Sequence, residues 1–429
     1  MYSSEVFATG RPTLWVTLQG VLLVGMMILL IQPRAVPDPF RVGAALSWTA
    51  ICLLAGIPTL ISAVRRLTLP ATKLDPFLLA YVACYVIVLP FSIGRHTSLD
   101  WLVALLANVL LFYAVVQTTR STLSWAATLL LAIVVGTAVL EIIGVDFHLE
   151  RGILTRMAEY DRPEGWGGYP ELGYLLCVQI AILMAIFQTT SSRLHRWGAA
   201  SMIGIALLEL VFLYSRLAWI TAAALLLVAA IAGRPLRAMW RPVVGVVVVA
   251  LLAGAVIART PAGSTLLTSV TERAASAGRL VIWERTTALI RDHPWTGVGA
   301  GNFQAIFEPV YNPVLNNDLR RGGHAHNLWL QQAAELGLFT AGVYAVLWVA
   351  VLLMAARQIN GSWVQRAAFL VLVVIVVRNM GDYMFFSTGG GAARLHTLLW
   401  IVWGVVGAEP FSFQRTSPLL SADAGVAGE

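Results

Sequence analysis

Long runs of apolar residues, separated by short polar segments, recur along nearly the whole chain. A helix needs about 20 mainly apolar residues to cross ~30 Å of hydrocarbon. Runs of this length predict twelve membrane-spanning helices, at about 13–32, 43–64, 76–94, 99–117, 121–143, 170–189, 198–214, 217–233, 242–258, 327–355, 364–380 and 391–408. The first run is too long for the apolar part of a signal peptide, so we expect it to remain as a span. The pattern predicts an all-α polytopic membrane protein.

The composition agrees with this pattern and narrows the possible partners. Hydrophobic residues make up 58% of the chain and charged residues 12%, against about 25% charged in soluble domains. The net charge of +7 lies mostly in short loops between predicted helices, which is typical of membrane proteins and excludes a nucleic-acid partner. Cys52, Cys84 and Cys177 lie in apolar runs and indicate neither a disulfide framework nor a metal site.

The basic residues also predict the orientation. Many follow the even-numbered spans two, four, six, eight and ten, among them Arg65, Arg66, Arg120, Arg193, Arg196, Arg234, Arg237, Arg241, Arg357 and Arg366. This side is expected to face the cytoplasm, together with both termini. The opposite side then carries two long segments, 145–169 and 259–326. We treat residues 1–429 as a single membrane domain with these two outer loops.

The longer outer segment contains a predicted helix from about Ser276 to Asp292, followed by Pro294. Its apolar residues favour a position along the membrane interface. Arg279 and Arg285 are six residues apart, and six residues rotate an ideal helix by about 240° net, so the two side chains point in different directions. Trp283 lies one turn after Arg279 and could stack on its guanidinium.

Motifs of soluble enzymes do not occur: the sequence contains no nucleotide-binding loop, HExxH, CxxC or DxD pair. Polar residues inside the apolar runs are therefore of interest. Arg216 lies in a short turn at a membrane boundary, where an arginine can also reach the headgroups without any catalytic role. Glu141, Glu209 and Glu335 lie inside predicted spans, and an intramembrane carboxylate requires a partner or a function.

The segment RRGGHAHNLWLQQAAELGLFTAG, from Arg320 to Gly342, places two histidines directly before an apolar helix. Asn327 is the predicted helix cap. His326 would then face the positive end of the helix dipole, which favours a neutral imidazole able to accept a proton. Further along the segment, Ala333, Gly337 and Ala341 form a face of small residues that predicts close packing of another helix.

These residues resemble a known family. His326–Asn327, nine residues, Gly337, two residues and Thr340 are similar to the signature of bacterial O-antigen ligases, within the O-antigen ligase/polymerase superfamily. SRLAW at 215–219 and GRLVIWERTTALIRDHPWTGVGAGNF at 278–303 resemble two further segments of that family. The stretch GGYPELGY at 167–174 departs from it, because the superfamily often has an Asn-Pro-Asn-like segment there.

The resemblance implies a fold and a reaction. The fold would be similar to GT-C-type glycosyltransferases, with a periplasmic helical cap. The reaction would move a glycan from undecaprenyl pyrophosphate to lipid A–core at the periplasmic face of the bacterial inner membrane, with inversion and without a metal or other cofactor. The resemblance assigns diphosphate binding to Arg216 and Arg279, with Arg285 as a less certain third, and general-base catalysis to His326. His324 would be an alternate base or would orient His326. Asp382 would orient His326 or an acceptor sugar, and Trp283 belongs to the same substrate-binding set.

Three alternatives stay open. An O-antigen polymerase would use a second lipid-linked repeat unit as the acceptor. A protein O-oligosaccharyltransferase would use a serine hydroxyl. A lipid or solute transporter belongs to a different class and predicts charges at the membrane midplane between paired halves. Glu209 and Glu335 are compatible with a transporter, but the sequence shows no internal repeat.

Overall fold

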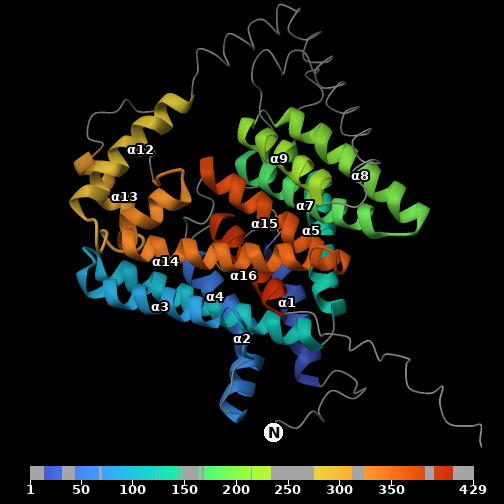
Figure 1. Ribbon diagram of the computed structural model, residues 1–429, viewed down its shortest axis with the longest axis horizontal. Coiled ribbons are helices and arrows are strands. Elements are labelled where there is room, and N and C mark those ends of the chain that lie inside the picture. The colour runs from blue at the N-terminus through green and yellow to red at the C-terminus, as the bar shows by residue number, and fades with distance from the viewer. Residues whose placement is uncertain are drawn as a thin grey trace, which may run out of the picture.

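The computed structural model describes residues 14–30, 44–66, 70–121, 123–143, 145–146, 164–165, 169–213, 215–232, 275–311, 323–381 and 391–408. The helices in these ranges are α1 (Leu14–Leu30), α2 (Ala44–Arg66), α3 (Asp75–Val88), η1 (Leu89–Phe91), α4 (Arg95–Ser121), α5 (Leu123–Ile143), α7 (Tyr169–Thr189), α8 (Arg193–Phe212), α9 (Arg216–Ala232), α12 (Ala275–Asp292), α13 (Phe303–Ile306), η3 (Phe307–Tyr311), α14 (Leu328–Gln358), α15 (Trp363–Gly381) and α16 (Gly391–Gly407). The short strands β1 (Val145–Asp146) and β2 (Glu164–Gly165) pair antiparallel. Figure 1 shows a helical bundle.

The helical prediction is confirmed. Each predicted span within the described residues coincides with an α-helix, and the span predicted at 242–258 lies outside them. Five described helices are long and apolar enough to cross a membrane, and several shorter apolar helices accompany them. The number of twelve spans and the GT-C likeness remain predictions. The helix predicted from Ser276 to Asp292 is present as α12.

Exposed side chains on α14 indicate contact with lipid. Phe339, Val346 and Leu353 follow each other at intervals of seven residues and are 67%, 53% and 53% exposed. Residues at this spacing lie on one face of a helix. Tyr344 and Trp348 lie on the opposite, buried side. A continuous apolar exposed face of this kind suits a hydrocarbon surrounding rather than water.

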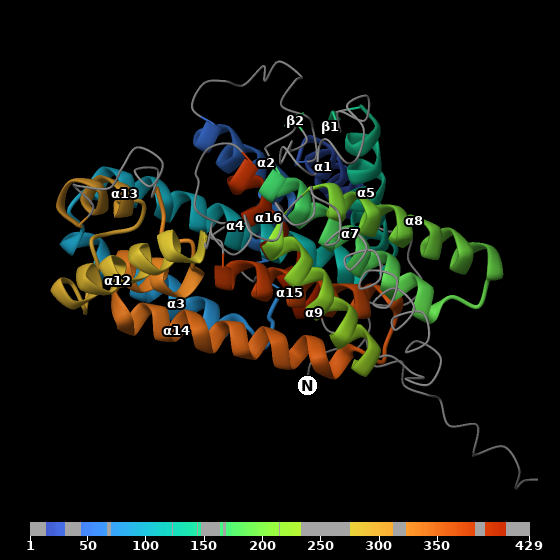
Figure 2. The ribbon, with the colours of Figure 1, turned by 90° about the horizontal axis from the view of Figure 1, so that it is seen from above.

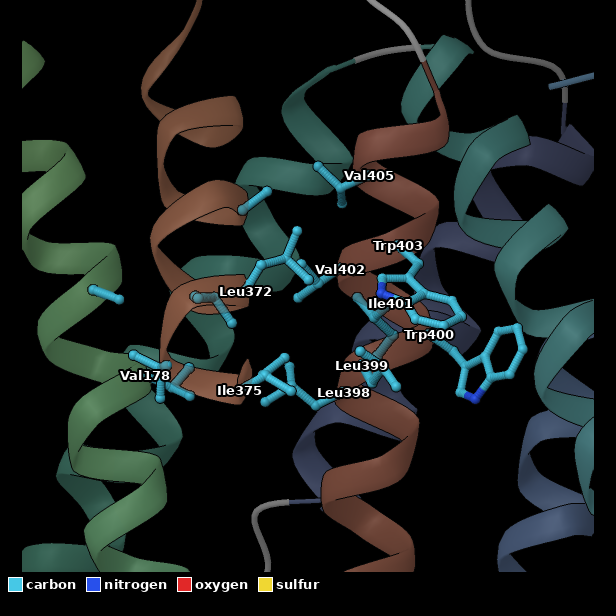
Figure 3. Packing of buried hydrophobic residues seen from close by; sticks show 14 of the residues in the cluster. Val178, Leu372, Ile375, Leu398, Leu399, Trp400, Ile401, Val402, Trp403 and Val405 are labelled. Atoms are coloured by element: carbon cyan, nitrogen blue, oxygen red, sulfur yellow. The ribbon is translucent and has the colours of Figure 1, made fainter. Parts of the chain in front are cut away.

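The core lies between α7, α14, α15 and α16. Figure 3 shows Leu372 and Ile375 of α15 facing Leu398 and Val402 of α16. Aromatic rings fill the space between α14 and α16: Trp348 and Trp403 meet edge to face with centroids 5.3 Å apart. Because lipid tails are as apolar as these side chains, such close packing is what favours helix association.

Contacts at the helix ends define the two ends of the bundle. At one end, Arg120 donates from Nε to the carbonyl of Ala408 (3.0 Å) and from Nη2 to that of Ala71 (2.9 Å). At the other end, the backbone N–H of Ile93 donates to the carbonyl of Val298 (3.1 Å). Residues that the predicted spans place on the same side of the membrane therefore meet at the same end of the bundle. Figures 1 and 2 place α12 and α13 at this second end, near the start of α14. That this end faces the periplasm remains a prediction.

Candidate active site

The segment His324–Asn327 leads directly into α14. Asn327 is the N-cap, because its Oδ1 accepts from the backbone N–H groups of Trp329 (3.0 Å) and Leu330 (3.1 Å). His326 has a φ of 49°, a left-handed conformation that costs a residue with a side chain about 1–3 kcal/mol. The rings of His324 and His326 lie with centroids 4.1 Å apart. The predicted cap is confirmed, and the two imidazoles lie side by side where α14 begins.

Ala325, between the two histidines, is held from two sides. The indole Nε1 of Trp283 on α12 donates to its carbonyl at 2.9 Å. Its backbone N–H donates to Oε1 of Gln331 on α14 at 2.7 Å. The side chain of Ala325 is fully buried. Trp283 therefore fixes the histidine segment directly, while its predicted stacking on Arg279 remains a prediction.

A break in α14 lies ten residues after Asn327, at Gly337, where φ is 80° and ψ is 163°. Backbone N–H groups of Val298 and Gly299 donate to the carbonyls of Ala334 (3.0 Å) and Glu335 (2.8 Å). The break thus binds the loop that follows α12 to α14. Backbone groups within hydrocarbon require such partners.

The small-residue face of α14 contacts both a helix and a loop. Ala333 and Ala341 pack in one buried cluster with Ile282, Leu289 and Ile290 of α12, as the sequence predicts. The chain that approaches Gly337 itself, however, is the loop after α12. A Cβ at position 337 would collide with the carbonyl of Trp295. Gly337 is required by its positive φ and by this backbone contact.

Gly337→Ala is therefore expected to destabilise the fold by about 1–3 kcal/mol from the positive φ alone, and further through the clash with the carbonyl of Trp295. Gly342 is the matched control in the same helix, since nothing lies within 4 Å of a Cβ built there. Gly342→Ala should be neutral, or stabilising by up to about 1 kcal/mol.

The measurement is thermal unfolding of the purified variants in detergent. A thiol-reactive fluorophore reports it, because Cys52, Cys84 and Cys177 are free and buried. Equal unfolding midpoints for Gly337→Ala and Gly342→Ala would contradict the structural role of the break.

Glu335, one of the intramembrane carboxylates noted in the sequence, has its partners in the same region. Its carboxyl group accepts from Nε2 of Gln331 at 2.9 Å and from the backbone N–H groups of Gly301 and Phe303. The side chain is 3% exposed. Glu335 thus connects the loop after α12 to the residue that holds Ala325.

The same loop is bound to the start of α4. Asn302 donates from Nδ2 to Oγ of Ser98 (3.0 Å) and to the carbonyl of Gly94 (3.2 Å). Ser98 Oγ in turn donates to the carbonyl of Ala300 (3.0 Å). Loop 294–303 is therefore fixed between α4 and α14, and its Val298 and Phe303 lie in the same buried cluster as Ala325.

Several helix ends meet beside this segment. Asn327 donates from Nδ2 to the carbonyl of Met380, at the end of α15, at 3.0 Å. A Cβ built on Gly381, the last residue of α15, would lie 3.7 Å from Nη1 of Arg279 and 3.0 Å from Cδ1 of Leu217. Leu217 is the second residue of α9. The guanidinium of Arg279 and the amide of Asn327 thus both lie at the last turn of α15, next to the start of α9.

Arg216 and Asp382, the other predicted site residues, lie at the start of α9 and directly after α15 in the sequence. Arg216 is the first residue of α9 and precedes Leu217, but its side chain lies outside the described residues. Asp382 directly follows the end of α15 and also lies outside them. The first residue of α9 is adjacent in sequence to Leu217, which lies near Gly381 and Arg279. The roles of Arg216 and Asp382 remain predictions.

Arg285 lies apart from Arg279, as the helical rotation predicts. Its Nη1 donates to the carbonyl of Tyr311 at the end of η3, at 3.1 Å. The hydroxyl of Tyr311 donates to Oδ2 of Asp292. Burial, followed by this hydrogen bond to Asp292, raises the pKa of Tyr311 to about 12. Tyr311 therefore stays protonated near neutral pH and acts as a donor, not as a base.

Two residues near the histidines escaped the sequence reasoning. Gln331 lies among both polar and apolar residues of α14, so the sequence did not single it out. Its spacing of four residues from both Asn327 and Glu335 nevertheless places all three near one helix face. Gly381 carries no signal of its own in the sequence. Among the residues that the structure describes, no group of three or more His, Cys, Asp or Glu side chains is arranged to hold a metal ion.

Comparison with known proteins bears on this region of the chain. No curated protein matches the sequence. The stretch that carries Arg216, Arg279, His326 and Glu335 does match a family. Residues 201–345 match the family model described as O-antigen ligase, and this match supports an O-antigen ligase-like family for the chain.

Proposed function

We propose that this protein is an O-antigen ligase that transfers a glycan from undecaprenyl pyrophosphate to a sugar hydroxyl of lipid A–core. The observation that carries the proposal is the meeting of Arg279, the ends of α15 and α9, and the histidine segment at one end of the bundle. A cation beside a paired imidazole, at the end of apolar helices, suits a substrate whose reactive diphosphate lies at the membrane surface.

The arginines act on the leaving group. A lipid diphosphate carries concentrated negative charge, which increases as the bond to the sugar breaks. Fixed cations stabilise that charge without reorganisation. The planar guanidinium donates two parallel hydrogen bonds to a phosphate. Arg279 and Arg216 take this role, and Arg285 is the third candidate.

His326 acts on the acceptor. A neutral imidazole takes the proton of the acceptor hydroxyl as its oxygen attacks the anomeric carbon. The new glycosidic C–O bond forms while the C–O bond to the diphosphate breaks, and the lipid diphosphate leaves with the electron pair. Attack opposite the leaving group inverts the anomeric centre. His324, whose ring lies against that of His326, and Asp382 orient the imidazole or a sugar.

The experiment that tests the proposal offers two acceptors to the purified protein. Lipid-linked O-antigen is supplied as the donor, with either lipid A–core or further lipid-linked O-antigen as the acceptor, in excess EDTA. We expect capped lipid A–core as the product, at the rate measured without EDTA, because the sequence lacks the DxD pair of metal-dependent transferases.

Each other outcome has a defined meaning. A lengthened lipid-linked polymer would make the protein an O-antigen polymerase. Loss of transfer in EDTA, restored by Mg²⁺ or Mn²⁺, would contradict metal independence. Absence of any transfer product, with both acceptors intact, would contradict the proposed function.

A further inference from the structure

Two buried polar side chains of α14 connect the loop after α12 to the histidine segment. Glu335 accepts from the backbone N–H groups of Gly301 and Phe303, and also from Nε2 of Gln331 at 2.9 Å. Oε1 of Gln331 accepts from the backbone N–H of Ala325 at 2.7 Å. The contacts therefore run without interruption from loop 294–303 to the residue that precedes His326.

The contacts determine the orientation of the Gln331 amide. Its oxygen must face Ala325, because a backbone N–H only donates, and its nitrogen must face the Glu335 carboxyl oxygen. Gln331 is fully buried and Glu335 is 3% exposed. Replacing Gln331 by an apolar residue leaves a buried N–H and a buried carboxyl oxygen without their partners, which is unfavourable in a low-dielectric interior.

The backbone around His326 needs support from other parts of the chain. His326 adopts a φ of 49°, and a side-chain-bearing residue keeps this conformation only where its surroundings impose it. Both backbone groups of Ala325 are fixed by side chains, the carbonyl by Trp283 and the N–H by Gln331. The backbone on the other side of His326 is fixed by the Asn327 cap.

We propose that Gln331 and Glu335 form a positioning pair that sets the direction of the His326 imidazole. The catalytic consequence of this inference rests on the proposed function, in which His326 takes a proton from the acceptor. The pair touches neither substrate nor reacting atoms. It acts through the backbone of Ala325, so its loss displaces the imidazole and leaves the diphosphate site of Arg279 in place.

The chain offers a matched control at the next position. Gln332 is also a buried glutamine of α14, at 8% exposed. Its Oε1 accepts from the hydroxyl of Tyr81 on α3 at 3.0 Å, not from the histidine segment. Gln332→Met therefore removes a buried hydrogen bond of the same kind and leaves the support of Ala325 intact.

The test compares Gln331→Met with Gln332→Met in two measurements. The first is the kcat and the KM for lipid-linked donor. We expect Gln331→Met to lower kcat by about 10- to 100-fold, the order of loss that a displaced catalytic group produces, with an unchanged donor KM. Gln332→Met should retain kcat within about threefold, since its hydrogen bond goes to Tyr81 of α3 and not to the histidine segment.

The second measurement does not depend on activity. Carbethoxylation of each histidine by diethyl pyrocarbonate is followed by peptide mass spectrometry, with the exposed His195 of α8 as the internal reference. Gln331→Met should change the modification rate of His326 relative to His195. Gln332→Met should leave that ratio at the parent value.

Exchanging the two residues of the pair distinguishes a loss of positioning from a general loss of folding. Gln331→Glu places two carboxyl groups in contact, and Glu335→Gln alone places two amides in contact. The double variant Gln331→Glu/Glu335→Gln restores one carboxyl and one amide in reversed order. An acceptor for Ala325 and an amide donor between the two positions are then both present, so we expect the double variant to recover kcat above either single variant.

The outcomes separate this inference from the proposed function. A parental His326 modification rate in Gln331→Met, or equal changes in Gln331→Met and Gln332→Met, would overturn the positioning pair whatever the activity. So would a double variant no better than the single ones. A parent protein that modifies normally but transfers no glycan would overturn the proposed function, and the modification rates would still decide on the pair.

Discussion

His326→Ala is expected to lower the rate of glycan transfer by about 10²–10⁴-fold, the usual contribution of a general base. The donor should still bind, because the guanidinium of Arg279, on α12, lies beside Gly381 at the end of α15. Its position does not depend on the imidazole of His326. The measurement is transfer to lipid A–core under single turnover, together with the affinity for lipid-linked donor. A parallel loss of donor affinity would assign His326 to diphosphate binding.

His326→Gln separates proton transfer from hydrogen bonding. The glutamine amide can donate and accept hydrogen bonds but does not take up a proton near neutral pH. We expect His326→Gln to be nearly as slow as His326→Ala. Transfer at close to the parental rate would show that the histidine only holds a sugar or a phosphate.

His324→Ala is the companion variant. The two rings lie 4.1 Å apart between centroids. In the proposed mechanism His324 only orients His326, so His324→Ala should lower the transfer rate less than His326→Ala does. A loss larger than that of His326→Ala would exchange the two roles.

The elements around these histidines were predictable where the cause is local. Asn327 was predicted as a cap because a polar side chain preceded a long apolar run, and its Oδ1 does accept from the first N–H groups of α14. The extent of α12 followed from apolar periodicity and from Pro294, which ends it. The different directions of Arg279 and Arg285 followed from helix geometry alone.

The break in α14 could not be predicted, because its cause lies elsewhere in the sequence. Gly337 stands inside a predicted helix without any local signal for a break. Only the loop of 294–299, some forty residues earlier, gives the freed backbone groups their partners. The partners of Glu335 are equally distant, at Gly301 and Phe303. A sequence shows that a buried carboxylate needs a partner, but the partner is set by which loop folds against it.

The position of Arg279 beside the end of α15 could not be predicted either, for the same reason. Helix rotation separates it from Arg285, but its closeness to Gly381 depends on the packing of α12, α15 and α9, which join distant parts of the chain. The family resemblance, not the physical pattern, selected Arg279 among the arginines of α12. The structure then adds the reason that it can serve a shared site.

Arg279→Ala and Arg216→Ala are each expected to lower transfer by about 10²–10³-fold, the loss seen when one donor to a developing anion is removed. Arg→Lys keeps the charge but not the two parallel hydrogen bonds of a guanidinium, so each Lys variant should lie between the parent and its Ala variant. Arg291 is the matched control, since it lies at the other end of α12 and is exposed. Arg291→Ala should transfer at the parental rate. The measurement is donor affinity and single-turnover transfer at equal expression of all variants. Parental activity in both Arg279→Ala and Arg216→Ala would show that the two arginines only meet lipid headgroups, and the diphosphate would then have to be bound elsewhere.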